Sequence, residues 1–209
     1  IGGATPLNMV GMGCFQELNA VPIMQPITKL AMLINTTKDI PNTLQKAFEI
    51  ATSGRYGPVY LEIPEDILNG KALRTADLSI SASKKTELAL PFNSIQSAAK
   101  HLLSAKQPLI IIGKSIRWSG AQKTLKCLVE NFNIPFISSP MGQGYLADDH
   151  SLCFNTDRSY VQNNADVVII IGARLNWTFR YGSEFSKQAT IIQFDADKNV
   201  LGNNVYPTV

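Results

Sequence analysis

The sequence predicts an α/β protein in which a parallel-sheet domain follows part of a second α/β domain. From about residue 92 onward, short apolar strands alternate with segments of helical periodicity, which is the pattern of right-handed βαβ units. The three clearest strands, 108–112, 166–171 and 190–194, are almost purely apolar. Helices are therefore expected on both faces of a parallel sheet. A helix, a turn and a strand precede these units at 40–63.

Composition narrows the class of protein. Of the 209 residues, 45% are hydrophobic and 17% are charged, with a formal net charge of +3, which argues against disorder, collagen and coiled coil. No block of like charge exceeds Lys84-Lys85, so no nucleic-acid partner is expected. The apolar runs are far shorter than the roughly 20 residues that span a bilayer, so no membrane partner is expected either. Three distant cysteines suggest neither a disulfide framework nor a zinc site.

The first seventy residues contain one helix and one strand by pattern. Residues 2–13 are rich in glycine, lack any period and are expected to form a loop. Apolar residues recur at helical spacing over 40–53, with Asp39 as a possible cap and Gly54 as the stop. Val59 to Ile63 then reads as a strand closed by Pro64.

The second part of the chain is more regular. The apolar pattern is lost over about 69–91, which reads as a linker. We therefore divide the chain into residues 1–70, a linker at 71–91 and a Rossmann-like domain at 92–209. The elements expected in this last domain are a helix at 94–104, a strand at 108–112, a helix at 119–131, a strand at 135–138, a short helix near Ser159, and strands at 166–171 and 190–194.

Two glycine motifs are rejected as phosphate loops. Gly113-Lys114-Ser115 follows a strand, but a Walker A loop needs a glycine at position 108, which is proline. Gly142, Gly144 and Ala147 fit a GxGxxG/A spacing, yet no helical period follows them. A dinucleotide role is therefore not expected at either motif.

A better nucleotide site lies where the strand at 166–171 ends. Gly172-Ala173-Arg174 follows that strand, and Asp195 follows the next one, about 20 residues later. At that spacing a carboxylate can accept hydrogen bonds from a ribose, and Arg174 can supply charge for a phosphate. Spacing alone equally allows a structural turn at Gly172 and a capping role for Asp195.

Other catalytic groups are scarce. His101 falls in an expected helix and His150 in an expected loop, and neither has a nucleophile motif beside it, so both are expected to be structural or solvated. No HExxH motif and no clustered carboxylates suggest a metal site.

Several strings resemble the thiamine-diphosphate enzymes of the acetolactate synthase superfamily. Those similar to the later half of its pyrimidine-binding domain are Phe15-Gln16-Glu17-Leu18, Pro26-Ile27-Thr28-Lys29 and Gly57-Pro58-Val59-Tyr60-Leu61-Glu62-Ile63-Pro64. Those similar to its central domain are Ala105-Lys106-Gln107-Pro108, Ile111-Ile112-Gly113-Lys114, Ile134-Pro135-Phe136, Pro140-Met141-Gly142, Asp149-His150, Ala165-Asp166-Val167 and Gly202-Asn203-Asn204. Gly172-Ala173-Arg174-Leu175-Asn176-Trp177 resembles the 2-hydroxyacyl-CoA lyases and oxalyl-CoA decarboxylases in particular.

The resemblance implies three α/β domains per subunit, with thiamine diphosphate between two subunits of a homodimer or homotetramer. Residues 1–70 would then be the C-terminal part of the pyrimidine-binding domain and 92–209 most of the central domain. The glutamate that activates the cofactor would precede Ile1, and the motif that holds Mg²⁺ and the diphosphate would follow Val209. We therefore expect these 209 residues to be an inactive fragment.

Site residues carry over by position in the motifs. The resemblance puts Phe15 and Gln16 beside the reactive carbon and the substrate carbonyl, where the Gln16 amide could donate to a developing oxyanion; the alternative for Gln16 is a bond that orders the loop. Lys29 would lie near the substrate channel or be solvated. Arg158 and Arg174 would meet phosphates of CoA or ADP, and Asp195 the ribose.

The implied reaction is cleavage of a 2-hydroxyacyl-CoA to formyl-CoA and an aldehyde, in the cytoplasm or the peroxisome. Oxalyl-CoA decarboxylation is the nearest alternative, and acetolactate synthesis is a more distant one. An alternative of another class is a non-catalytic protein that binds a nucleotide through the central domain alone.

Overall fold

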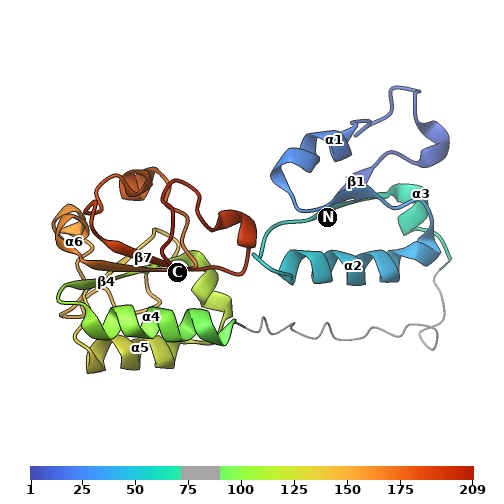
Figure 1. Ribbon diagram of the computed structural model, residues 1–209. Helices are drawn as coiled ribbons and strands as arrows, with labels where there is room; N and C mark the ends of the chain where they lie inside the picture. Colours follow the sequence, from blue (N-terminus) through green and yellow to red (C-terminus); the bar gives the residue numbers. More distant parts are fainter. Residues whose placement is uncertain (72–89) are drawn as a thin grey trace. The chain divides into compact units, whose positions relative to one another are not determined.

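The computed structural model describes residues 1–71 and 90–209, which divide into two compact units, Ile1–Glu87 and Leu88–Val209. Both units contain a parallel sheet with helices (Figure 1), so the α/β fold class is confirmed. Nearly all of the expected linker at 71–91 lies outside the described residues. Within the described part of the chain, every helix is too short or too polar to cross a membrane.

The first unit is built on a three-stranded parallel sheet in the order β1-β3-β2. Helix α2 packs on one face, where Ile34, Ala47, Leu61 and Ile63 form the buried core. Helix α1 contacts strands β2 and β3. The elements of the unit are β1 (Gly2–Ala4), η1 (Leu7–Met9), α1 (Ala20–Met24), η2 (Gln25–Ile27), β2 (Ala31–Leu33), η3 (Thr37–Asp39), α2 (Ile40–Thr52), β3 (Tyr60–Pro64) and α3 (Glu65–Leu68).

Two predictions for the first unit need correction. The expected loop at 2–13 begins with a strand, because Gly2–Ala4 pairs in register with Glu62, Ile63 and Pro64 of β3. This long-range pairing outweighs the low strand propensity of glycine. Asp39 makes no capping bond to α2 and instead accepts a hydrogen bond from the Thr36 hydroxyl at 2.5 Å.

The second unit is a four-stranded parallel sheet in the order β5-β4-β6-β7. Helices α4 and α5 pack on one face of the sheet, and α6 with the segment η6 packs on the other (Figure 1). Its elements are α4 (Phe92–Ser104), β4 (Pro108–Ile112), η5 (Lys114–Trp118), α5 (Gln122–Asn131), β5 (Phe136–Ser138), α6 (Arg158–Asn164), β6 (Val167–Ile171), η6 (Trp177–Gly182), β7 (Thr190–Phe194) and η7 (Lys198–Val200). The helix expected at 119–131 starts only at Gln122, because Gly120 is left-handed at φ 72°.

The strand order creates a switch point at the carboxyl ends of β4 and β6. The chain moves from β4 to β5 on one side and then returns to place β6 on the other side of β4. Ligands of open α/β sheets bind at such a point. Here the two strand ends are in contact. The Gly113 N–H donates to Ile171 O at 2.8 Å, and the backbones lie so close that a Cβ at position 113 would collide with the backbone of Gly172.

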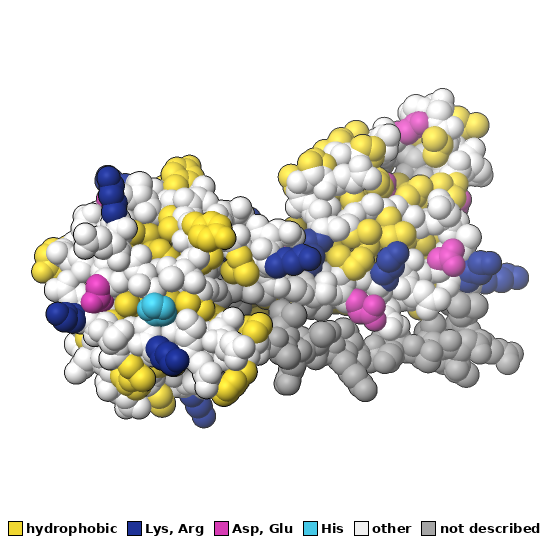
Figure 2. Space-filling model, viewed as in Figure 1, with side chains coloured by type: hydrophobic (Ala, Val, Ile, Leu, Met, Phe, Trp, Pro, Cys, Tyr) yellow, Lys and Arg dark blue, Asp and Glu magenta, His cyan; other side chains and the backbone are white. Residues whose placement is uncertain are grey.

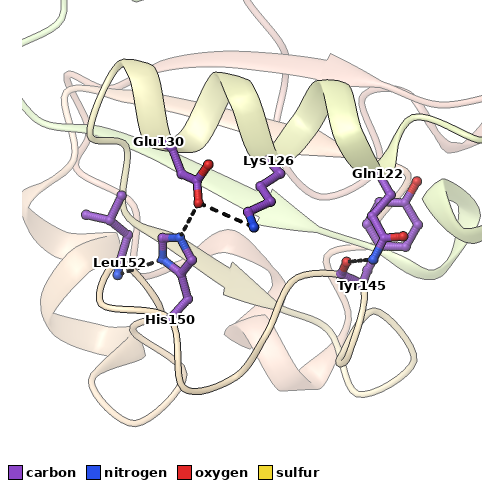
Figure 3. Close-up of polar contacts among 6 residues, drawn as sticks. All are labelled: Gln122, Lys126, Glu130, Tyr145, His150 and Leu152. Carbon is purple, nitrogen blue, oxygen red and sulfur yellow. Dashed lines mark hydrogen bonds and ion pairs between the residues drawn. The ribbon is translucent and has the colours of Figure 1, made fainter.

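The long segment between β5 and α6 is tied to α5 through His150 (Figure 3). The Leu152 N–H donates to His150 Nδ1 at 3.1 Å, so the ring proton lies on Nε2, which faces Glu130 Oε1 at 3.4 Å. Gln122 adds a second tie through its bond to the Tyr145 carbonyl at 2.6 Å. His150 therefore helps to order this segment, which agrees with the structural one of the two roles expected for it.

Glu62 is a buried acid on the middle strand of the first unit. Glu62 is only 5% exposed. It pairs with Gly2 of β1 and Leu33 of β2, and its side chain lies on the sheet face opposite the core. Burial raises the pKa of Glu62, and burial together with the Glu62 charge raises the pKa of neighbouring Tyr60. The carboxyl of Glu62 therefore ionises at a higher pH in the folded protein than in the unfolded chain.

Lys29 closes the carboxyl end of α2. Its ammonium group donates to the carbonyl of Ile50, to the Ser53 carbonyl at 2.7 Å and to the Arg55 carbonyl at 3.2 Å. Ile50 lies in the last turn of α2, and Ser53 and Arg55 follow the end of the helix. A cation at this position interacts favourably with the negative end of the helix dipole. Lys29 is exposed to solvent, as one of the two expectations held, and it also makes these bonds; its position in a substrate channel stays a prediction.

Glu62→Gln removes the ionisable group and keeps the shape of the side chain. Because the folded state has the higher pKa at this position, ionisation of Glu62 costs stability as the pH rises above the ordinary value of 4.5. We expect the variant to melt at a higher temperature than the parent protein at pH 8, with a gain that shrinks toward pH 4.5. Circular dichroism melts across this range measure it, with the exposed Glu49→Gln as the matched control. A gain independent of pH would contradict the assignment.

Lys29→Met keeps the methylene stem and removes the donor from the end of α2. We expect the free energy of unfolding to fall by about 1 kcal/mol, because the carbonyls at and just after the end of the helix lose a charged donor. Urea unfolding measures the change, and Lys46→Met on the exposed side of α2 should leave the midpoint unaltered. Equal midpoints for the two variants would show that the cap does not stabilise the fold.

Candidate functional site

A cavity of about 660 Å³ lies in the first unit, where β1 and β3 end. Its volume falls in the range of small-molecule sites, roughly 300–1,000 Å³. Its walls come from the loop after β1, the segment around Phe15 and the start of α3. The lining residues are Gly3, Ala4, Thr5, Pro6, Asn8, Met9, Cys14, Phe15, Gln16, Ile63, Glu65, Asp66, Leu68 and Asn69.

The structure brings both predicted catalytic residues to this cavity. Phe15 is 88% exposed, and hydrophobic atoms reach the surface along the preceding loop and α1 (Figure 2). Gln16 has a left-handed backbone at φ 63°, and its Oε1 lies 3.8 Å from the position that a Cβ on Gly3 would take. Its side chain therefore turns back toward β1 and lines the cavity.

The charges of the cavity wall are acidic. Glu65 and Asp66 line it, and both oxygens of Asp66 lie 3.2 Å from the Leu7 N–H, which fixes the loop after β1. Lysine and arginine are absent from the described lining. The wall therefore suits a neutral or cationic ring better than a diphosphate, whose charge needs basic groups or a metal.

The predicted nucleotide residues lie along the carboxyl edge of the second sheet, beside different strands. Arg174 follows β6 by three residues, its side chain is exposed, and among the described residues no partner of its guanidinium is recorded. Asp195 directly follows β7 and accepts a hydrogen bond from the Asp197 N–H at 3.0 Å. Asp195 thus stabilises a local turn, which is the structural alternative that the sequence left open for it. Arg174 faces solvent.

Arg158 is bound more deeply into the same edge. It opens α6 and donates from Nη2 to the carbonyl of Ser138, the last residue of β5, at 2.6 Å. Its Nε donates to Asn155 O at 3.1 Å, and its guanidinium lies 5.7 Å from the centre of the Phe179 ring. Burial lowers the pKa of Arg158, and no carboxylate of the described chain pairs with it. The guanidinium of Arg158 is therefore held by carbonyl oxygens and lies near an aromatic ring, without a carboxylate partner in the described residues.

Two hydroxyl groups near this edge were missed by sequence reasoning. Ser115 Oγ and Ser138 Oγ are buried without a hydrogen-bond partner among the described atoms. The Ser115 side chain packs against Gly172, and Ser138 is fully buried at the end of β5. Serine in a loop or at a strand end gives no sequence signal of this kind, because burial here depends on the crossing of distant strands.

Metal-binding side chains are not clustered in the described residues. Groups of three or more histidine, cysteine, aspartate or glutamate side chains that could hold an ion do not occur there. The three cysteines are all free thiols.

Comparison with known proteins gives the family. The family described as "Thiamine pyrophosphate enzyme, central domain" matches residues 95–209. Mouse 2-hydroxyacyl-CoA lyase 1 is 36% identical to the chain over 218 residues, which cover the whole chain and 36% of the relative. Oxalyl-CoA decarboxylase of Escherichia coli K12 is 33% identical over 198 residues, which cover 92% of the chain and 35% of the relative.

A third relative comes from an archaeon. The probable acetolactate synthase large subunit of Methanocaldococcus jannaschii is 33% identical over 219 residues, which cover 97% of the chain and 36% of that protein. The chain thus spans little more than a third of the length of the curated relatives it matches. The match to the central domain covers more than half of the chain, and the chain belongs to the thiamine pyrophosphate enzymes.

Proposed function

We propose that the chain is part of a thiamine-diphosphate-dependent lyase that cleaves a 2-hydroxyacyl-CoA between C1 and C2. The products are formyl-CoA and an aldehyde. The observation that carries the proposal is the 36% identity to a 2-hydroxyacyl-CoA lyase, in an alignment that covers the whole chain. The string Gly172 to Trp177, at the carboxyl edge of the second sheet, resembles the same group of enzymes.

Phe15 and Gln16 are the residues that we assign to the reacting carbon. Thiamine diphosphate, when bound, supplies the electron sink for breaking a carbon–carbon bond. The amide of Gln16 lines the cavity, where it can donate to an oxygen that gains negative charge in the reaction. Phe15 presents an aromatic face that can exclude water from the reacting atoms.

The cavity holds at most part of the cofactor in this proposal. Its apolar wall and amide groups fit a ring, and its acidic residues do not fit a diphosphate. We therefore propose that Mg²⁺ and the diphosphate are bound by parts of the protein beyond these 209 residues. The complete protein would act as a homodimer or homotetramer, in the cytoplasm or the peroxisome.

Arg158, Arg174 and Asp195 are proposed to bind the nucleotide part of the acyl-CoA substrate, or ADP at the same edge. Arg174 is exposed and able to reach a phosphate, whereas Arg158 is anchored by Ser138 and offers a charge without a carboxylate beside it. Asp195 is half-buried directly after β7, at the same edge of the sheet as Arg174. The three residues lie at the carboxyl ends of the strands, which is where open parallel sheets usually bind ligands.

The test uses the full-length protein that contains this chain, loaded with thiamine diphosphate and Mg²⁺. We expect 2-hydroxyacyl-CoA to give formyl-CoA and an aldehyde in equal amounts, detected by mass spectrometry. Oxalyl-CoA and pyruvate are offered in parallel. Formyl-CoA and carbon dioxide from oxalyl-CoA alone, or acetolactate from pyruvate alone, would replace the lyase proposal by one of the alternative reactions.

Arg174→Ala should weaken binding of ADP or CoA to the full-length protein by about 1.5–3 kcal/mol, because a charged hydrogen bond to phosphate is lost. That loss corresponds to roughly 10- to 150-fold in Kd. Isothermal titration calorimetry measures it. Lys100→Ala, which removes one positive charge from the exposed surface of α4, is the control and should leave Kd unchanged. Equal affinity of the Arg174 variant and the parent protein would remove Arg174 from the site.

A further inference from the structure

The loop that carries Phe15 and Gln16 is built around one carboxylate. Glu17 accepts hydrogen bonds from the backbone N–H groups of Gly11, of Gly13 at 2.7 Å and of Cys14 at 3.1 Å. Gly11 and Gly13 are left-handed, at φ 89° and 72°, and this alternation makes successive amides converge on one point. The loop thus forms an anion-binding concavity that is filled by its own glutamate.

The Glu17 carboxylate is held in its charged form by these bonds. The N–H of Gly11 contributes most to lowering the pKa of Glu17, and those of Cys14 and Gly13 lower it further against the opposing effect of burial. A glutamine at this position would offer a single acceptor and would turn N–H groups toward N–H groups. The loop geometry therefore depends on the charge as well as on the size of the side chain.

A second tie joins the loop to the sheet. Thr5 directly follows β1, is only 4% exposed, and donates from Oγ1 to the Phe15 carbonyl at 2.9 Å. This bond fixes the peptide group between Phe15 and Gln16. Because Thr5 directly follows a paired strand, this hydrogen bond fixes the position of the peptide group relative to the end of β1.

The two ties surround a residue in a costly conformation. Gln16 is left-handed at φ 63°, a backbone conformation that is unfavourable for a residue other than glycine. Its carbonyl accepts from the Leu18 N–H at 2.9 Å, which tightens the turn on the other side. Without Thr5 and Glu17, the free energy of the chain would favour an extended Gln16, and its amide would leave the cavity wall.

We propose that Thr5 and Glu17 are positioning residues that hold the Gln16 amide at the cavity. The inference rests on the role proposed above for Gln16. Thr5 holds the peptide group before Gln16 from the sheet side, and Glu17 holds the glycine loop from within. Neither side chain needs to touch the substrate for this function.

The test is a double-mutant cycle in the loaded full-length protein, run on whichever of the three substrates the parent protein converts. Thr5→Val, which keeps the shape and removes the hydroxyl, should lower kcat about tenfold while KM and the Kd for thiamine diphosphate change less than about twofold. Thr5→Ser should restore most of kcat. In a Gln16→Ala background, Thr5→Val should have almost no further effect. A tenfold loss that persists in that background, or no loss in the parent protein, would overturn the proposal.

Hydrogen exchange supplies a readout that needs no activity. Glu17→Gln should speed exchange of the Gly11, Gly13 and Cys14 amides at least tenfold, and the control Glu49→Gln on α2 should not. Unchanged exchange in the Glu17 variant would overturn the assigned role of Glu17. Failure of the lyase proposal would be seen separately, as turnover of a different substrate by the parent protein.

Discussion

The absence of a side chain at position 113 is the constraint on which the second unit depends. Strands β4 and β6 run side by side to their ends only because Gly113 lets the backbone of Gly172 lie against it. The left-handed φ of 61° at Gly172 then turns the chain away from the sheet toward Arg174. A methyl group at position 113 would separate the two strand ends and widen the switch point.

The same rule of sheet geometry organises both units. In parallel sheets all strands end at one edge, so loops that are distant in sequence meet there. In the first unit this edge carries the cavity with Phe15 and Gln16, and in the second it carries Arg158, Arg174 and Asp195. Phe15, Arg158 and Asp195 make hydrogen bonds that fix their positions, whereas Arg174 is exposed.

Residues 108–112 and 190–194 were predicted as strands to the residue, because buried parallel strands are uninterrupted apolar runs. Arg174 and Asp195 could be placed at the sheet edge for the same reason, since each follows a strand. The strand Gly2–Ala4 could not be predicted, because its partner β3 lies almost sixty residues away. The Ser138 partner of Arg158 and the helix cap made by Lys29 depend on similar long-range contacts, which local patterns do not contain.

The described cores of the two units differ greatly in size. The second unit buries two apolar clusters, one on each face of its sheet, whereas the first has a small cluster around Ile34, Ala47, Leu61 and Ile63. Exposure of apolar surface is what raises the heat capacity on unfolding. The first unit buries the smaller apolar cluster, so its free energy of unfolding is expected to curve less with temperature than that of the second unit.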